Sequence, residues 1–463
     1  MAGKQPINAD LPPVPQGEPD PKPTEQPEQA VSERNPEPRS SPAAGPSRPS
    51  RRRRSIPAAL KAIAGLVVVA IVFLLAAVLG GGGSSGPAKK PAPAPPAAES
   101  TAGEEKTPAA EAAEALGYPS FATNNTTRIG GSDAATTAAG VALAVYPSTS
   151  AAQRPAAVTV VDEGEWQGAI AAAVLMAPPI RAPLLVATDG ALPDPTTQAL
   201  EALGPKGGKA TGGAQVFAIG SAPSPDGMKV SQAKGAGPAA LAIAVEALRN
   251  KLVGKPPRHI VLAPEAAPEF AMPAAAWAAR SGDAVLFSSP DKLSKATAAA
   301  LGESPKVPVY VLGPSSAISS DVVREVIRNG NPVRRVSGED AVENAIALAR
   351  YSHGDFGWNV NDPGHGFVVA RGGAPIDAAI AAPLSASGTW GPLLLTDDAD
   401  TLPKALREYL LDIKPGYTTD PTRAFYNHVW VIGDQEAIDV KVQAEIDQLA
   451  ELAKIGGEGG EEP

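Results

Sequence analysis

One short segment of the sequence carries an unusual set of polar and aromatic side chains. Residues 351–365 contain two histidines, two aspartates, two asparagines, a tryptophan and a tyrosine, and glycines interrupt the segment. Long polar loops on a rigid scaffold often carry function. The composition suits carbohydrate stacking or a metal ion, through His353, Asp355, Trp358, Asp362 and His365. In a structural alternative, the two aspartates cap turns while Phe356 and Trp358 hold the loop to the core.

Catalytic motifs find little support. The four histidines (His259, His353, His365, His428) show no His-x-x-x-His spacing, and neither a phosphate-binding loop motif nor a Gly-x-Ser-x-Gly motif occurs. The absence of cysteine excludes thiol chemistry. We therefore predict a non-enzymatic protein with no catalytic residues, no metal and no cofactor. The alternative is a hydrolase or a ligand-sensing receptor built on the loop, which requires His353, Asp355, Asp362 and His365 to converge.

The elements that would position this loop belong to a pattern that occurs three times. Each copy contains a strand-like run, a small-residue helix, a second run, another helix and a third run that ends at glycine. The runs are 157–161, 182–186 and 216–220, then 259–262, 284–287 and 309–313, then 366–370, 391–395 and 429–433. Short apolar strands that alternate with helices predict parallel sheets covered on both faces, and so the α/β class.

A short leader precedes each copy. Arg128-Ile129-Gly130-Gly131-Ser132-Asp133 opens the first and Arg335-Val336-Ser337-Gly338-Glu339-Asp340 opens the third, whereas the second has only Lys234-Gly235-Ala236-Gly237-Pro238. Glycines followed by an aspartate predict a turn into a helix whose first N–H groups the carboxylate caps. This explanation of Asp133 and Asp340 requires no ligand.

Together these features resemble the cell wall-binding repeat type 2 family, which typically has three tandem modules on surface proteins of Gram-positive bacteria. The resemblance rests on the Arg-x-x-Gly leaders, on Pro-Leu-Leu at 183–185 and 392–394 with Thr-Asp shortly after, and on strands ending in Ile-Gly or Leu-Gly. It spans three modules, 118–226, 227–329 and 330–452. The second is degenerate, because Ala284-Val285-Leu286 replaces Pro-Leu-Leu.

The resemblance implies a Rossmann-like or Toprim-like fold for each module and a pseudo-threefold arrangement of the three. It also implies non-catalytic binding of an anionic wall polymer or carbohydrate. The matching positions are Arg128, Leu184, Leu185, Arg335, Leu394 and Leu395. An arginine can donate two parallel hydrogen bonds to a phosphate. An arginine at a module junction is, however, as often the partner of an aspartate or of a free carbonyl.

The N-terminal part has a different composition from the repeats. Residues 1–55 are rich in Pro, Gln, Glu and Ser, which predicts a disordered tail. Residues 56–80 are almost continuously apolar and long enough to cross a bilayer as one helix. A cleaved signal peptide is the alternative, but its apolar core would be shorter and nearer the N-terminus. Residues 81–117 predict a Gly/Pro/Ala linker, and 453–463 a disordered acidic C-terminus.

The charge distribution indicates orientation and partners. Arg51-Arg52-Arg53-Arg54 directly precedes the apolar segment, which predicts a cytoplasmic N-terminus and a C-terminal region outside the plasma membrane, at the wall. The net charge of −9 disfavours nucleic acid as a partner. An anionic polymer must then be held by a local basic site. The sequence does not identify a partner for the cytoplasmic tail.

Overall fold

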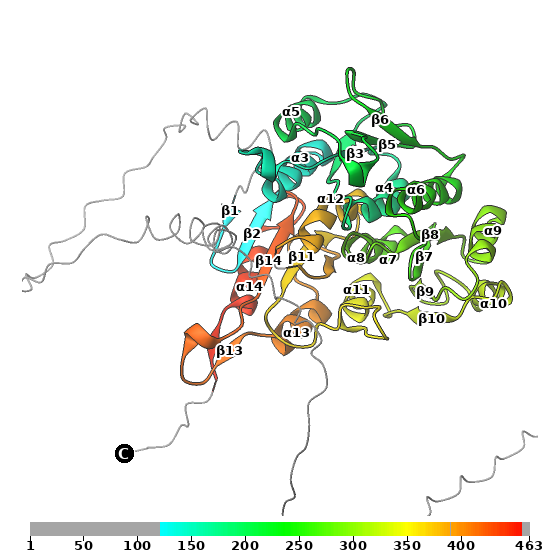
Figure 1. The fold of residues 1–463 in the computed structure, drawn as a ribbon. Helices are drawn as coiled ribbons and strands as arrows, with labels where there is room; N and C mark the ends of the chain where they lie inside the picture. Colours follow the sequence, from blue (N-terminus) through cyan, green and yellow to red (C-terminus); the bar gives the residue numbers. More distant parts are fainter. Residues whose placement is uncertain (1–120, 389, 456–463) are drawn as a thin grey trace, which may run out of the picture. The chain divides into compact units, whose positions relative to one another are not determined.

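The computed structural model describes residues 121–388 and 390–455, which form an α/β fold with mostly parallel sheets (Figure 1). The predicted α/β class is therefore confirmed. The predicted tail, membrane-spanning segment and linker lie outside these residues. Within the described ranges, no helix is both long and apolar enough to cross a membrane.

The described chain contains three sheets of four or five strands. The first has the order β4-β3-β5-β6 and the second the order β10-β9-β7-β8, and in both every pairing is parallel. The third has the order β1-β2-β14-β11-β12, in which only the β1–β2 pairing is antiparallel. The strands are β1 (Phe121–Ala122), β2 (Thr126–Ile129), β3 (Val158–Asp162), β4 (Leu184–Ala187), β5 (Val216–Ile219), β6 (Val230–Ala233), β7 (Ile260–Pro264), β8 (Ala284–Ser288), β9 (Val309–Leu312), β10 (Val333–Val336), β11 (Gly366–Arg371), β12 (Leu393–Thr396) and β14 (His428–Ile432).

Helices cover the sheets, and the central strands are buried almost throughout, as their apolar sequences predict. The α-helices are α3 (Ala134–Val145), α4 (Trp166–Ala172), α5 (Asp194–Leu203), α6 (Pro238–Val253), α7 (Pro268–Ala271), α8 (Pro273–Ser281), α9 (Lys295–Glu303), α10 (Ser320–Arg328), α11 (Ala341–Arg350), α12 (Pro375–Ala386), α13 (Lys404–Asp412) and α14 (Val440–Ala450). The 3₁₀ turns are η1 (Ala151–Gln153), η2 (Ala173–Met176), η3 (Lys209–Thr211) and η4 (Pro421–Arg423).

The leader strands do not pair within the copy that they precede. β6 pairs with β5, and β10 pairs with β9, so each completes the sheet of the preceding copy. β2, from the start of the described chain, pairs with β14 from near its end. Consecutive copies are therefore linked by shared strands, and the N-terminal strand completes the last sheet.

In each copy one helix follows the first strand and packs between the sheets. These helices are α4, α8 and α12. α12 packs against both α8 and α4, and η2 packs against α8 (Figure 1). Their contact faces are mostly alanine, which lets the helix backbones approach closely. The pseudo-threefold relation and the three module boundaries stay predictions.

The end of the described chain corrects one sequence-based expectation. Ala453–Lys454, placed by the sequence in a disordered C-terminus, forms β15 and pairs with β13 (Gly416–Tyr417). The predicted helix caps are confirmed, because the side chain of Asp133 accepts from the Thr136 N–H and that of Asp340 from the Glu343 N–H.

Candidate functional site

Arg128, a predicted polymer contact, is one of the most buried side chains of the molecule. It lies on β2 and is 1% exposed. Its Nε donates to Gln443 Oε1 at 2.9 Å, and its two terminal nitrogens donate to the carbonyl oxygens of Gly433 (3.0 Å), Asp434 (2.5 Å) and Ile438 (2.6 Å). These groups use four of the five N–H donors of the guanidinium, and burial lowers its pKa. Arg128 therefore holds the loop between β14 and α14.

Arg335 has the same role in the second sheet. From β10 it donates to the carbonyl oxygens of Gly313 (2.5 Å) and Ile318 (2.6 Å), in the loop between β9 and α10. It is only partly buried. The sequence left open whether these arginines bind phosphate or free carbonyls, and the geometry gives both of them carbonyl partners.

The four predicted leucines are buried inside their sheets. Leu184 and Leu185 lie in β4, and Leu394 and Leu395 lie in β12, all at most 4% exposed. A strand covered on both faces points its apolar side chains into the core, so these residues pack rather than bind. Leu395 alone lines a small cavity, of about 270 Å³, at the carboxyl end of β12. Glu269 and Asp397 line the same cavity, and their carboxylates do not suit an anionic ligand.

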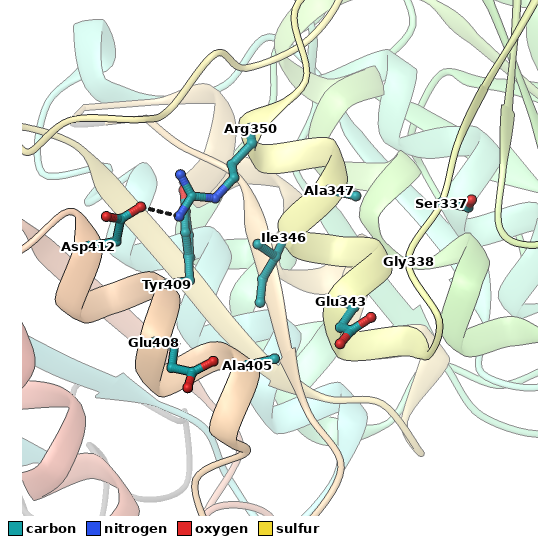
Figure 2. Close-up of a pocket in the computed structure, with 10 residues that line it drawn as sticks. All are labelled: Ser337, Gly338, Glu343, Ile346, Ala347, Arg350, Ala405, Glu408, Tyr409 and Asp412. Atoms are coloured by element: carbon teal, nitrogen blue, oxygen red, sulfur yellow. Dashed lines mark hydrogen bonds and ion pairs between the residues drawn. The ribbon is translucent and has the colours of Figure 1, made fainter.

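A larger groove, of about 590 Å³, lies between α11 and α13 (Figure 2). Its one arginine, Arg350, reaches across to Asp412 at 2.5 Å and stacks on the Tyr409 ring, 4.7 Å from its centroid. Glu343 and Glu408 also line it. With its arginine already paired and carboxylates in excess, this groove does not suit an anionic polymer either.

The polar loop 351–365 docks onto the second sheet through its aromatic side chains. Phe356 is buried and stacks on Tyr310 of β9, with ring centroids 3.5 Å apart and planes within 3° of parallel. Trp358 packs edge-on against Trp277 of α8 at 5.6 Å. The structural alternative drawn from the sequence is confirmed for these two rings, because both fasten the loop to the core.

The predicted polar residues of this loop do not converge. His353 Nδ1 lies 2.9 Å from the Tyr310 hydroxyl, Asp355 pairs with Arg258, and His365 Nε2 lies 3.3 Å from Asp362. Over 121–388 and 390–455, no three His, Cys, Asp or Glu side chains gather closely enough to hold a metal ion. The hydrolase alternative requires His353, Asp355, Asp362 and His365 to converge on one site, and in this structure they do not.

The most unusual polar arrangement is one that sequence reasoning missed. His259 is 6% exposed and lies between two carboxylates, with Nδ1 3.0 Å from Asp283 and Nε2 3.0 Å from Asp355. Asp283 also accepts from the Trp277 indole N–H at 3.0 Å. Burial lowers the pKa of His259, but the hydrogen bond and charge of Asp283, with the charge of Asp355, more than offset it, so the net pKa is raised. The His259 ring therefore ties the exposed loop to the buried aspartate.

Comparison with known proteins supports a wall-binding assignment for part of the chain. Residues 335–443 match the family model Cell wall binding domain 2 (CWB2), which covers β10 to the start of α14. A search of curated proteins gave no match.

Two solved structures from Clostridium difficile have a similar fold at low sequence identity. Cwp6 is 18% identical with a TM-score of 0.55, and the alignment covers 70% of this chain and 47% of that chain. Cwp8 is 16% identical with a TM-score of 0.53, and the alignment covers 71% and 52%. The chain thus spans about half the length of each structure. The segment 335–443 therefore matches a Cell wall binding domain 2, within a fold similar to that of Cwp6 and Cwp8.

Proposed function

We propose that this protein binds an anionic polymer of the cell wall without catalysing a reaction on it. The observation that carries the proposal is the match of residues 335–443 to Cell wall binding domain 2. The separate pairing of the loop histidines and aspartates supports the non-catalytic part, because none of these pairs includes a serine, threonine or cysteine that a base could activate. Three tandem modules, 118–226, 227–329 and 330–452, in a pseudo-threefold arrangement would allow multivalent contact with a repeating polymer.

The proposal includes a membrane anchor. The apolar segment 56–80 would cross the plasma membrane once, with residues 1–55 in the cytoplasm and the repeats outside. The linker 81–117 would hold the repeats away from the lipid. Such a protein would tether the wall to the membrane.

Co-sedimentation with cell walls tests the binding proposal. The full chain, kept soluble in a mild detergent, is mixed with purified walls of its own species, before and after acid extraction of the secondary polymers. We expect retention on intact walls, loss after extraction, and a decrease as salt increases, because the chain itself carries a net charge of −9 and must use a local basic site. The chain without walls controls for self-pelleting, and absence of retention on intact walls would contradict the proposal.

Protease treatment of intact, wall-digested cells tests the anchor separately. If residues 81–463 lie outside, added protease removes them and leaves a short membrane-bound fragment that an N-terminal tag still marks. A protected full-length chain would reverse the proposed orientation. Release of the chain by alkaline carbonate would show that no segment spans the bilayer.

A further inference from the structure

A small cavity lies where the docked loop meets the C-terminal end of α8. Its volume is about 280 Å³, close to the lower end of small-molecule sites and suited to a single sugar ring. Arg258, Arg280, Ser281 and Asp355 contribute polar groups to its wall. Sequence positions from the second and third copies thus combine in one site.

Three of the five tryptophans of the chain line this cavity. Trp358 is stacked near Trp390 with centroids 6.1 Å apart and planes 29° apart, and Trp277 packs edge-on against Trp358. Trp390 is 38% exposed, which is unusual for so large an apolar ring. Only 4% of the residues are aromatic, so this concentration is local to the cavity. Indole walls suit the C–H-rich face of a sugar.

The cavity also offers a cationic hydrogen-bond donor that the described protein does not pair. The Arg280 guanidinium lies 4.0 Å from the centroid of the Trp390 ring, and it makes no ion pair or hydrogen bond with any described residue. The Trp358 indole N–H is buried and has no acceptor among the described residues. This nitrogen is almost inaccessible, so the donor that the cavity presents to a ligand is Arg280 rather than the Trp358 N–H.

The remaining charges of the cavity are already paired. Asp355 lies against both Arg258 and His259, so its negative charge is balanced within the protein. Among the residues that the structure describes, Arg280 is then the cation of this cavity without a counterion. The site therefore favours a ligand that brings an apolar ring face and one negative charge.

We propose that this cavity binds one sugar unit that bears an anionic group, a carboxylate or a phosphate, with Arg280 as its charge partner and Trp358 and Trp390 as its walls. The inference rests on the proposed wall-polymer function and gives it a location. It places recognition at the junction of the second and third sheets, away from the strand-end leucines.

Fluorine NMR of the full chain, labelled with 5-fluorotryptophan in detergent micelles, tests this directly. The probes are glucuronate and glucose 6-phosphate, with glucose and inorganic phosphate as controls for the ring alone and the charge alone. We expect saturable shifts at the Trp358 and Trp390 resonances, with a millimolar Kd for at least one charged sugar and weaker binding of both controls. Trp166 and Trp430 lie outside the cavity and serve as internal references. A response to glucuronate alone identifies the carboxylate, and a response to glucose 6-phosphate alone identifies the phosphate.

Substitutions then assign the roles. Arg280→Gln should weaken the charged sugar at least tenfold and leave glucose unchanged, whereas Arg324→Gln, on the exposed surface of α10, should change neither. Trp390→Ala should abolish binding and Trp390→Phe should restore part of it, while Phe425→Ala removes another exposed ring (71% exposed) as the matched control. Equal binding by the wild type and Arg280→Gln, or no shift at Trp358 and Trp390, would overturn the proposal.

The two proposals fail in different ways. If walls retain the wild-type chain but no probe shifts Trp358 or Trp390, this site is wrong and the wall-binding function stands. If the probes shift these two resonances in a chain that walls do not retain, the sugar site is supported and the wall-binding function is contradicted.

Discussion

The leader strands β2 and β10 differ from the leader strand β6 in one side chain at the same register position. Arg128 of β2 and Arg335 of β10 each donate to carbonyls of the loop that follows the neighbouring strand. β6 carries Gln232 there, whose amide donates instead to Ser224 Oγ at 3.0 Å. The first sheet therefore has a leader strand, β6, but no arginine at this position.

The connection after the neighbouring strand explains the difference. After β9 and after β14 the chain turns at a glycine and enters a helix, capped by Ser319 or Asp439. After β5 it reaches β6 without an intervening helix. Both of these helix-entry loops turn backbone carbonyl groups toward the leader strand, and the arginine supplies donors for them. The two arginines thus occur where the neighbouring strand is followed by a loop that enters a helix.

The largest expected effect is that of Arg128→Ala. The substitution removes the side-chain donor of the Gly433 and Ile438 carbonyls and of Gln443, while the Asp434 carbonyl keeps the Ile438 N–H at 3.2 Å. It also loosens the contact between β2 and β14. We expect the free energy of unfolding to fall by about 3–5 kcal/mol, measured by urea denaturation with tryptophan fluorescence. Arg324→Ala, at an exposed ion pair, should cost under about 0.5 kcal/mol. A loss below about 1 kcal/mol for Arg128→Ala would contradict the role given to it.

Gly235→Ala tests the close approach of backbone that the second and third leaders share. A Cβ at Gly235 would lie 2.2 Å from the Leu241 backbone nitrogen, and one at Gly338 would lie 2.3 Å from the Asn344 nitrogen. Such a collision with backbone cannot be relieved by a side-chain rotation, so we expect a loss of about 2–4 kcal/mol from backbone displacement. Gly227→Ala, which meets no neighbouring atom, is the control, although its positive φ alone costs about 1 kcal/mol. Equal losses for the two variants would remove the steric explanation.

Arg335→Ala should cost less than Arg128→Ala. Arg335 makes two hydrogen bonds to carbonyls instead of three, and water reaches its partly exposed site and replaces some of the lost donors. We expect a loss of about 1–2 kcal/mol in the same denaturation experiment. Arg335→Lys should recover part of it. A loss equal to that of Arg128→Ala would show that burial does not set the difference.

The loop after β14 should give the protein a pH dependence that the loops after β9 and β5 do not. In the loop after β14 an aspartate, Asp434, follows the glycine, whereas Pro314 follows the glycine after β9 and Ser221 follows the glycine after β5. Burial first, and then the charges of Glu163 and Asp434, raise the pKa of Asp377 to about 7. Between pH 4 and 7 the unfolded chain has released this proton and the folded chain retains it, so ionisation increasingly destabilises the fold as the pH rises.

Asp377→Asn removes this ionisation. We expect the variant to match the wild type near pH 4 and to be more stable by on the order of 1 kcal/mol at pH 8, a value reduced because Asp377 is partly exposed. Urea denaturation at both pH values measures the difference. Asp412→Asn, at an exposed ion pair, is the control, and a gain for Asp377→Asn that does not vary with pH would contradict the ionisation argument.

The repeating part of the fold was readable from the sequence because it depends on local patterns. Runs such as 216–220 and 309–313 have the length and apolar content of buried parallel strands, and Asp133 and Asp340 stand where caps are needed. The pairing of β2 with β14 was not readable, because the two strands lie some three hundred positions apart and no spacing relates them. The same limit applies to Arg128, whose carbonyl partners all come from the far end of the chain.

The candidate site was predictable only in part. The composition of 351–365 drew attention to Asp355 and Trp358, and both line the cavity. The sequence did not indicate Arg280 or Trp390 as site residues, because neither has other candidate binding residues near it in the sequence. The two come together only because α8 packs near the chain before β12 in the fold. The His259–Asp283 pair was likewise hidden, because a histidine at the start of one strand and an aspartate before the next have no recognisable spacing.

The smallest expected effect is that of Gln232→Ala. Gln232 is exposed and its one side-chain hydrogen bond reaches Ser224, also at the surface, so its loss should change the free energy of unfolding by less than about 0.5 kcal/mol. Gln232→Arg completes the comparison. With no helix-entry loop after β5 to supply free carbonyls, the new guanidinium should remain in solvent and stabilise the protein by no more than a few tenths of a kcal/mol. If Gln232→Arg stabilised the first sheet by more than about 1 kcal/mol, an arginine at this position would stabilise any of the three leader strands. The proposed dependence on a helix-entry loop would then be wrong.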